Sequence, residues 1–512
     1  MTIYNFNLLV GYLPSGVDYA QGYRAKLFRD LHQESYFIFT EAPEWEYIKF
    51  YLEDVGLKEE ELKSLHLSYL DDVSLIPQLS FDEVKAFYPE IMDDQQFEWV
   101  NDVKAYTNIG NNHYGINFSF KNPSSDIVSS VAIFLDGNLI RRDFYTNRKL
   151  FSKYYHPKLI NNTLSASTYK VNFYNREGQI VFEENLASEN PYYIFANQTK
   201  RLTKFDLVEE FVTNLKLSKH DTLIMDRSAD MSFAQVLMKH KGPAKLVAMI
   251  HSEHFFPKNY DPSYLYLNYE YYYIIRNAHL IDYFVTSTEL QKINFAETVI
   301  NETGVTPTIK VIPVGSVEIK ESLNRQRQPF SMMTASRLYL GKRVDLLVSA
   351  AILAKKEIPQ LEFSIYGRGH EEARLERMIT EQKAQDYIFL KGHLDLNKIY
   401  PQYELYVSAS PRESFGLSLL EAISHGLAMI GLNVPYGNPT FIENGANGYL
   451  VDYDHLGDQQ VTIEALAEKM ISYFKLTEIE RQSFNDKSSE IAKRFTKDKV
   501  KAAWLNLLQV TK

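Results

Sequence analysis

The sequence contains no cysteine and only 3 tryptophans among its 512 residues. The absence of cysteine excludes disulfide bonds, thiolate metal sites and cysteine nucleophiles. No apolar run approaches the roughly 20 residues that a membrane-spanning helix needs. Residues 1–10 lack the basic region of a signal peptide. We therefore expect a cytoplasmic protein, with contact to the inner face of the cell membrane only through a partner.

Positive charge is also scarce, because 55 lysines and arginines face 65 acidic residues and the formal net charge is −10. Proteins that bind nucleic acid through its backbone need a basic surface, so no nucleic-acid partner is expected. A small basic pocket for one phosphorylated ligand is compatible with this balance. The chain is 45% hydrophobic and 23% charged, which is typical of a globular protein. Its length predicts about three folding units.

The chain opens with the pattern of a doubly wound α/β fold. A predicted strand, Ile3–Val10, is followed by a loop that ends at Gly16 and by a helical pattern over Val17–Leu31. The alternation of strands and helices resumes near residue 191, and a second series begins at Ile309. Such alternation predicts parallel sheets in two Rossmann-like lobes. The predicted strands of the second series are Ser331–Thr334, Leu361–Tyr366, Tyr387–Leu390, Leu405–Val407 and Ala428–Ile430.

Residues 46–190 have a different pattern. Short runs of alternating apolar and polar residues, such as Tyr114–Phe120, are separated by turn sequences such as Asp136-Gly137-Asn138. This pattern predicts an antiparallel, all-β meander inserted in the first lobe. The predicted domains are therefore an α/β lobe (1–45 and 191–308), the β-rich insertion (46–190), a second α/β lobe (309–494) and a C-terminal helix that packs back across the lobes (495–512).

The most specific segment spans residues 411–422, directly after the predicted strand Leu405–Val407. Glu413 and Glu421 flank a Phe-Gly-Leu sequence within it. A helix N-terminus presents free N–H groups to an anion, and Gly416 lets the backbone approach a ligand closely. Two helical turns separate the carboxylates by about 12 Å, so they cannot act as an acid–base pair on one bond. The first is expected to accept hydrogen bonds from sugar hydroxyls and the second from a ribose diol.

This segment resembles the E-x7-E signature of retaining glycosyltransferases of family 4, which have the α/β GT-B fold of two Rossmann-like, doubly wound lobes. The resemblance implies that Arg337 and Lys342, after the strand Ser331–Thr334, clamp the donor diphosphate. It also implies that His251 lies near the donor sugar, so that these three residues and Glu413 are catalytic. The further residues that the resemblance assigns to donor binding are Gly16, Val17, Asp18, Tyr19, His393, Leu394, Ser414, Phe415, Gly416, Leu417 and Glu421.

The opening segment and the β insertion resemble one branch of this family, the GtfA-type glycosyltransferases of accessory secretion systems. The resemblance implies retaining transfer of N-acetylglucosamine from UDP-N-acetylglucosamine to serine or threonine hydroxyls of a serine-rich repeat adhesin before export. It also implies a GtfB-like stabilising subunit as partner. By the same resemblance, the lobe 1–45 and 191–308 binds the acceptor, the insertion 46–190 binds the acceptor or the partner, and the lobe 309–494 binds the donor. UDP-glucose as donor and a TarM-like wall-teichoic-acid glycosyltransferase are alternatives. A further alternative is a non-catalytic subunit that binds a sugar nucleotide. The presence of all four motif residues, Arg337, Lys342, Glu413 and Glu421, argues against it.

Two segments invite a metal interpretation. Residues 251–254 read His-Ser-Glu-His, which is not the zinc-binding pattern His-Glu-x-x-His, so His254 is expected to be structural. Residues 452–454 read Asp-Tyr-Asp and are expected to form a turn. We therefore expect no metal and no cofactor other than the donor substrate.

Overall fold

The computed structural model describes residues 1–8, 16–89, 91, 98–100, 104–109, 114–160, 163–197, 201–227, 231–255, 266–318 and 327–509. Most of the predicted glycine loop before Gly16 lies outside these residues. The chain forms two compact units, one of Met1–Asp18 and Gln33–Leu246 and the other of Tyr19–His32 and Val247–Lys512. None of the described helices combines the length and the apolar character that crossing a bilayer requires.

The first unit contains parallel strands in the order β14-β1-β2-β3. All four residues of β14 are buried, as expected for a strand that is covered on both faces. The strands are β1 (Thr2–Asn7), β2 (Glu34–Phe39), β3 (Leu62–Ser64) and β14 (Thr222–Met225). The helices are α2 (Trp45–Glu53), η1 (Glu59–Glu61), η2 (Leu67–Tyr69), α4 (Lys204–Asn214) and α5 (Met231–His240).

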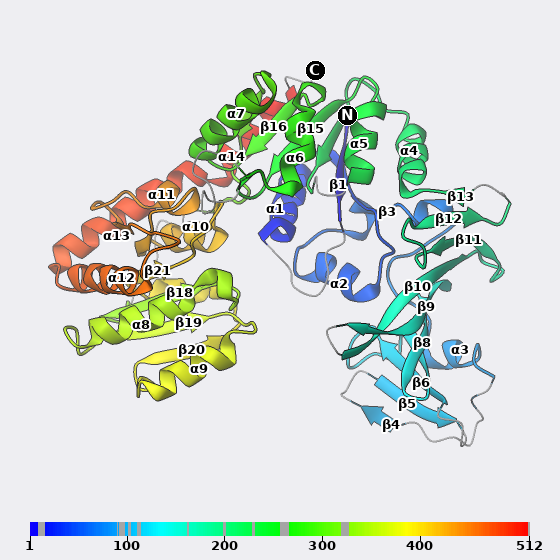
Figure 1. Ribbon diagram of the computed structural model, residues 1–512, viewed down its shortest axis with the longest axis horizontal. Coiled ribbons are helices and arrows are strands. Elements are labelled where there is room, and N and C mark those ends of the chain that lie inside the picture. Colours follow the sequence, from blue (N-terminus) through cyan, green and yellow to red (C-terminus); the bar gives the residue numbers. More distant parts are fainter. Residues whose placement is uncertain are drawn as a thin grey trace. The chain divides into compact units, whose positions relative to one another are not determined.

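A ten-stranded sheet follows in the same unit (Figure 1). Each strand pairs antiparallel with its neighbours in sequence, which confirms the predicted meander. The short helix α3 (Phe81–Lys85) packs on it through Val84. The strands are β4 (Glu98–Val100), β5 (Lys104–Ile109), β6 (Tyr114–Phe120), β7 (Val128–Leu135), β8 (Asn138–Tyr145), β9 (Lys149–Ile160), β10 (Thr163–Tyr174), β11 (Ile180–Asn185), β12 (Tyr192–Phe195) and β13 (Arg201–Leu202).

The boundaries of the β insertion differ from the predicted 46–190. Helix α2 and strand β3 precede the meander, and β3 pairs with β2 in the α/β sheet. At the other end, β12 and β13 still belong to the antiparallel sheet. Strands of three or two residues carry too little periodicity for their sheet to be assigned from sequence.

The second unit begins with part of helix α1 (Gly16–Asp30), from Tyr19 onward, and contains parallel strands in the order β15-β16-β17. These are β15 (Lys245–Ile250), β16 (Tyr283–Thr286) and β17 (Ile309–Val311), with α6 (Tyr269–Arg276), η3 (Ala278–Leu280) and α7 (Glu289–Thr303). Because β17 pairs with β16, it closes this sheet. The prediction that a second α/β series begins at Ile309 is therefore wrong, and that series begins at β18.

A six-stranded parallel sheet in the same unit has the order β20-β19-β18-β21-β22-β23. The direction of strand succession reverses between β18 and β21. The strands are β18 (Ser331–Ala335), β19 (Glu362–Tyr366), β20 (Ile388–Gly392), β21 (Leu405–Ser408), β22 (Ala428–Leu432) and β23 (Gly448–Val451). The helices are η4 (Leu340–Lys342), α8 (Val344–Lys355), α9 (Glu372–Glu381), η5 (Leu396–Lys398), η6 (Tyr400–Gln402), α10 (Leu417–Ser424), α11 (Gly437–Phe441), α12 (Gln459–Phe474), α13 (Glu478–Ala492) and η7 (Lys493–Phe495).

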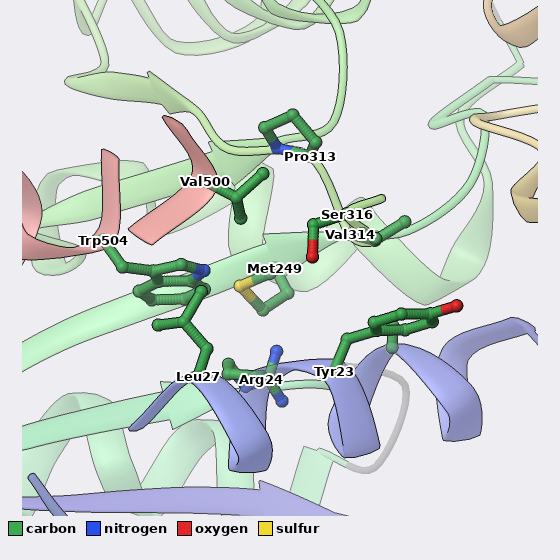
Figure 2. A pocket seen from close by; sticks show the side chains of 11 residues that line it. Tyr23, Arg24, Leu27, Met249, Pro313, Val314, Ser316, Val500 and Trp504 are labelled. Atoms are coloured by element: carbon green, nitrogen blue, oxygen red, sulfur yellow. The ribbon is translucent and has the colours of Figure 1, made fainter. Parts of the chain in front are cut away.

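The C-terminal helix α14 (Lys497–Gln509) packs against α1. The ring of Trp504 lies 5.2 Å from that of Phe28, and the guanidinium carbon of Arg24 lies 5.9 Å from the indole centroid. Figure 2 shows Arg24 of α1 and Trp504 of α14 on a shared cavity that Met249 also lines. Its volume of about 20 Å³ has room for about one water. The contact between the two helices is therefore close-packed.

Candidate active site

The loops that follow β18 and β21 carry most of the predicted catalytic residues. These strands are adjacent at the point where the order of the sheet reverses. In open α/β sheets, ligands bind outside the carboxyl ends of the strands at such a switch point. Arg337 and Lys342 follow β18, whereas Glu413 follows β21. The structure thus places three residues from distant parts of the sequence at one edge of the sheet.

Lys342 and Glu413 form an ion pair in which the Nζ and Oε2 atoms are 2.5 Å apart. Both side chains are mostly buried, at 18% and 17% exposed. Burial by itself lowers the pKa of Lys342, but the charge of Glu413 and its hydrogen bond outweigh burial and the pKa is raised. The lysine is therefore cationic at neutral pH and can neutralise a phosphate. The Ser410 hydroxyl lies 3.5 Å from the same ammonium group.

The backbone around Glu413 is held by the next strand–helix connection. The Glu413 carbonyl oxygen accepts hydrogen bonds from the backbone N–H groups of Tyr436, at 2.9 Å, and Gly437, at 2.6 Å. A Cβ atom on Gly437 would lie only 2.3 Å from the Phe415 carbonyl oxygen. Glycine is therefore needed there for the two loops to approach each other.

Helix α10 starts directly after this loop. Gly416 occupies its N-cap with φ 86°, a left-handed conformation that glycine adopts without strain. The Tyr406 hydroxyl lies 3.0 Å from both the Ala335 carbonyl oxygen and the Ser418 hydroxyl. This buried tyrosine thus links the end of β18 to the first turn of α10. Ser418 in that turn is half-buried, and the free N–H groups at a helix start are suited to meet an anionic ligand.

Glu421 lies in the same helix and has a different environment from Glu413. The Tyr400 hydroxyl donates a hydrogen bond of 3.0 Å to its Oε2 atom. Burial raises the pKa of Glu421, and the bond from Tyr400 offsets burial only in part. Its second oxygen is suited to accept a hydroxyl hydrogen bond, in line with the predicted ribose contact.

Arg337 is exposed, and its guanidinium carbon lies 5.1 Å from the ring centroid of Tyr339. Its loop is held by the turn after β19. The Ser336 N–H donates to the Tyr366 carbonyl at 3.1 Å, and the Leu338 N–H donates to the Arg368 carbonyl at 2.8 Å. The turn at residues 367–369, directly after β19, therefore supports the loop that carries Arg337.

His251 follows β15, and its main chain is fixed by side chains from two helices. The Tyr271 hydroxyl accepts hydrogen bonds from the N–H groups of His251, at 3.1 Å, and Ser252, at 2.9 Å. The Gln291 amide donates to the carbonyl oxygens of Ile250 and Ser252. The histidine side chain is half-buried. These hydrogen bonds hold the main chain on both sides of His251 and thereby fix where its side chain begins.

Glu253, two residues further on, is a site residue that sequence reasoning missed. Its carboxylate lies 3.7 Å from the guanidinium of Arg412, the residue before Glu413. Burial raises the pKa of Glu253 to about 7, although the charge of Arg412 lowers it. From the sequence, segment 251–254 indicated a role for His251 and excluded a zinc pattern, and no local signal pairs Glu253 with Arg412. A carboxyl group with such a pKa in a site changes its charge near neutral pH.

His254 is structural, as predicted. It is buried, and its Nε2 atom lies 2.8 Å from the Thr298 hydroxyl. Burial lowers the pKa of His254 to about 4, so the imidazole is neutral at physiological pH. Asp454 accepts a hydrogen bond of 2.9 Å from the Leu456 N–H, and its carbonyl oxygen accepts one of 3.3 Å from the Gly457 N–H, so the turn begins at Asp454 and does not span 452–454 as expected. Within the described residues, no group of three or more His, Cys, Asp or Glu could hold a metal ion.

The remaining predicted donor-binding residues divide by environment. Phe415 is 3% exposed and packs on Phe441 and Phe495, so its side chain supports the loop. The side chain of Leu417 packs against the backbone of Gly315. Of the other positions, Ser414 is half-buried at the loop surface, while His393 and Leu394 follow β20 and are exposed.

Residues 16–19 form the first turn of α1. Gly16 is exposed there, whereas Val17 and Tyr19 are half-buried. Asp18 is buried in the first unit. Its carboxylate accepts a hydrogen bond of 2.9 Å from the Tyr51 hydroxyl and lies 3.6 Å from the Arg227 guanidinium. Asp18, which was predicted to bind the donor, thus makes its described contacts with Tyr51 and Arg227 of the same unit.

Comparison with known proteins agrees with this arrangement. Residues 316–490 match the family of glycosyl transferases group 1, and residues 92–197 match the GtfA extended beta-sheet domain. The fold and the site thus define a UDP-sugar glycosyltransferase of the GT-B type. The chain is 35% identical to the UDP-N-acetylglucosamine–peptide N-acetylglucosaminyltransferase GtfA subunit of Streptococcus parasanguinis, over 99% of each protein. The chain therefore belongs to the GtfA family.

Further relatives support this assignment. The GtfA subunit of Streptococcus gordonii is also 35% identical, over 99% of this chain and 98% of that protein. The crystal structure of the pneumococcal O-GlcNAc transferase GtfA in complex with UDP and GlcNAc is 34% identical and has a TM-score of 0.88, covering 100% of this chain and 99% of that one. The GtfA/B complex matches with a TM-score of 0.86, 34% identity and the same coverage. TarM, at 20% identity over 99% and 98% of the chains and a TM-score of 0.76, shares the fold.

Proposed function

We propose that this protein transfers N-acetylglucosamine from UDP-N-acetylglucosamine to serine or threonine hydroxyls of a protein, with retention of configuration. The observation that carries the proposal is the pairing of Lys342 with Glu413, which lies in the loop that leads into α10. It is supported by full-length relatives whose names state that donor and a peptide acceptor.

Each group has a distinct part in this reaction. Arg337 and Lys342 bind the diphosphate, and their charge stabilises the negative charge that develops on it as the glycosidic bond breaks. Glu413, oriented by Lys342, accepts hydrogen bonds from the hydroxyls of the donor sugar. Glu421 accepts one from the ribose. The acceptor hydroxyl attacks from the face that the diphosphate leaves, and the departing phosphate takes its proton, so no covalent enzyme intermediate is required.

The acceptor we propose is the serine-rich repeat region of a cell-surface adhesin, modified in the cytoplasm before export. The proposed partner is a GtfB-like subunit, because a related GtfA was crystallised as a GtfA/B complex. The ten-stranded sheet is the proposed surface for the partner or the acceptor. We also propose that no metal is required, since Arg337 and Lys342 supply the positive charge that a divalent cation would bring to the diphosphate.

The test is the intact mass of a serine-rich acceptor peptide after incubation with this protein and UDP-N-acetylglucosamine or UDP-glucose. Each reaction is run with and without the partner subunit and with and without EDTA. A mass increase of one N-acetylhexosamine, unchanged by EDTA, is expected. A hexose increase would assign UDP-glucose as donor. Labelling of poly(ribitol phosphate) and not of the peptide would refute the protein acceptor.

A further inference from the structure

The first unit contains a second cavity, of about 300 Å³, that the proposed reaction does not use. It opens where β2 and β3 end. Thr40 and Glu41 directly follow β2, and His66 follows β3. These two strands are parallel neighbours, with Phe39 opposite Ser64, so their carboxyl ends meet at one edge. This is the edge at which open α/β sheets bind ligands.

The opposite wall comes from the β meander and α4. Lys153 of β9, Thr168 of β10, Glu184 of β11 and Tyr193 of β12 line it, together with Lys204 at the start of α4. The cavity is therefore built from two different sheets within one unit. Its volume lies at the lower end of the ~300–1,000 Å³ range of small-molecule sites. That size suits a single monosaccharide.

His66 is the residue that marks this cavity as a ligand site. Its side chain is only 2% exposed, and neither ring nitrogen makes a hydrogen bond of good geometry among the described residues, although the Glu41 backbone lies near enough for a weak interaction. The ring stacks on Phe173 at 5.2 Å with an interplanar angle of 9°, which fixes its plane. Its Nε2 atom is 3.8 Å from the Glu184 carboxylate, beyond hydrogen-bond distance. A buried polar group without a partner costs free energy, which a ligand hydroxyl would recover.

The charges on the wall favour a neutral ligand. Lys153 pairs with Glu44, and Lys204 pairs with Glu41 at 3.2 Å. Glu184 accepts a hydrogen bond of 2.8 Å from the Tyr193 hydroxyl. Three carboxylates would repel a phosphate, and two lysines would repel a cation. Sugar hydroxyls both donate and accept, so they match a wall that alternates carboxylates, ammonium groups and an imidazole.

We propose that this cavity binds one neutral monosaccharide unit, with its hydroxyls bonded to Glu184, His66 and the flanking lysine–glutamate pairs. The sugar is either free or already attached to the acceptor, and only the attached form rests on the proposed function. In that form, the site would hold a modified segment of the acceptor while another serine is glycosylated.

The test is titration calorimetry with methyl N-acetylglucosaminide, a serine peptide that carries one N-acetylglucosamine, and the unmodified peptide. All proteins carry Glu413→Gln, which removes sugar binding at the donor site. Glu184→Gln keeps the shape of the side chain and the bond from Tyr193, and is expected to weaken binding of both sugar ligands at least tenfold. Glu183→Gln is the matched control, because successive residues of β11 point to opposite faces. It is expected to change the affinity less than twofold.

Thr168→Trp provides a second variant, in which a bulky ring on β10 fills the cavity, and binding of both sugar ligands is expected to be lost. Tighter binding of the glycopeptide than of the free sugar would support the attached form, and equal binding would support the free form. Absence of sugar binding, or an affinity that Glu184→Gln leaves unchanged or Glu183→Gln lowers equally, would overturn the proposal. Glu184-dependent binding, together with absence of sugar transfer by the protein that retains Glu413, would refute the proposed function alone.

Discussion

Three carboxylates at the candidate active site differ in what surrounds them. Glu413 is paired with the buried Lys342, whereas Glu421 receives a hydrogen bond from the neutral phenol of Tyr400. Glu253 faces Arg412 at a longer distance of 3.7 Å and is affected mainly by burial. The same residue type therefore supplies one carboxylate in a close, buried ion pair and two whose pKa values are raised by burial.

The first prediction concerns Glu413. Replacing it with glutamine removes the charge that orients Lys342 and the oxygen that meets the sugar. We expect transfer to fall by at least about 100-fold, as for loss of other preorganised polar groups, while UDP binding largely survives. Peptide-transfer kinetics and UDP titration measure the two effects. Glu464→Gln, on the exposed face of α12, is the control and should change neither. Loss of UDP binding with Glu413→Gln would mean that the roles of Glu413 and Glu421 are exchanged.

Arg337 carries the second prediction. Its exposed guanidinium is free to reach a diphosphate, and Arg337→Ala is expected to lower the rate of transfer by about 100-fold or more, because leaving-group charge is then less stabilised. Steady-state transfer rates at saturating donor measure this. Arg377→Ala, also exposed but on α9, should keep the normal rate. A near-normal rate for Arg337→Ala would contradict the clamp.

The third prediction follows from the raised pKa of Glu253, about 7 against a usual 4.5. Between these values the folded state binds more protons than the unfolded state. The contribution of Glu253 to stability is therefore present below pH 4.5 and is lost as the pH rises to 7, by roughly 3 kcal/mol. His254 acts in the opposite direction, because its pKa is lowered to about 4 and its contribution is lost as the pH falls.

The Glu253→Gln variant isolates the first of these contributions. Relative to the unmodified protein, it is expected to gain stability progressively between pH 4.5 and 7, as measured by denaturant unfolding at a series of pH values. A constant difference between the two proteins across this range would show that Glu253 titrates normally.

At the scale of elements, the site depends on loops that touch through their backbones. The turn after β19 supports the loop after β18, and the segment at Tyr436 supports the loop after β21. Where two backbones approach this closely, there is no room for a side chain, and the position must be glycine. A Cβ atom on Gly367 would lie 1.8 Å from the Ser336 carbonyl oxygen, and the φ angle there is 131°.

The fourth prediction is that Gly367→Ala displaces the loop that holds Arg337. We expect a loss of about 1–3 kcal/mol in unfolding free energy from backbone strain alone, and weaker UDP binding in addition. Gly178→Ala is the matched control, since Gly178 has φ 75° but no atom within 4 Å of its added Cβ. It should cost stability without any change in UDP affinity. Equal UDP binding by both variants would refute the support role.

At the scale of the whole molecule, the second unit combines segments from both ends of the sequence. Helix α14 packs on α1, and Lys501 donates a hydrogen bond of 3.2 Å to the Asp30 carbonyl. The backbone of Val317 pairs with Thr496, just before α14 begins. Segments from near the two ends of the sequence therefore pack together in the unit that also carries the active-site loops.

The fifth prediction concerns Trp504, which is 3% exposed at this helix contact. Trp504→Ala is expected to lower the unfolding free energy by about 3–5 kcal/mol, as is usual for truncation of a buried aromatic ring. Lys499→Ala, exposed on the same helix, should change it by less than about 0.5 kcal/mol. Denaturant unfolding of both variants checks this. Little change for Trp504→Ala would show that α14 is dispensable.

Much of the fold could be predicted from the sequence, because its signals are local. The period-two run Tyr114–Phe120 coincides with β6, and the predicted strands Ser331–Thr334 and Ala428–Ile430 lie within β18 and β22. The assignment of β3, β12 and β17 to sheets could not be predicted, because it depends on pairing with distant strands.

For the candidate site, the sequence by itself determined which residues supply the chemistry. The motif around Glu413 and the Arg337–Lys342 pair are short patterns whose residue types define charge and hydrogen bonding. Only the tertiary structure decided which of these side chains contact each other. It placed Lys342 against Glu413, buried Glu253 beside Arg412, and built the cavity around His66 from two sheets. Burial and charge interactions depend on residues that are far apart in the chain, and their strengths are set by distances that no local pattern contains.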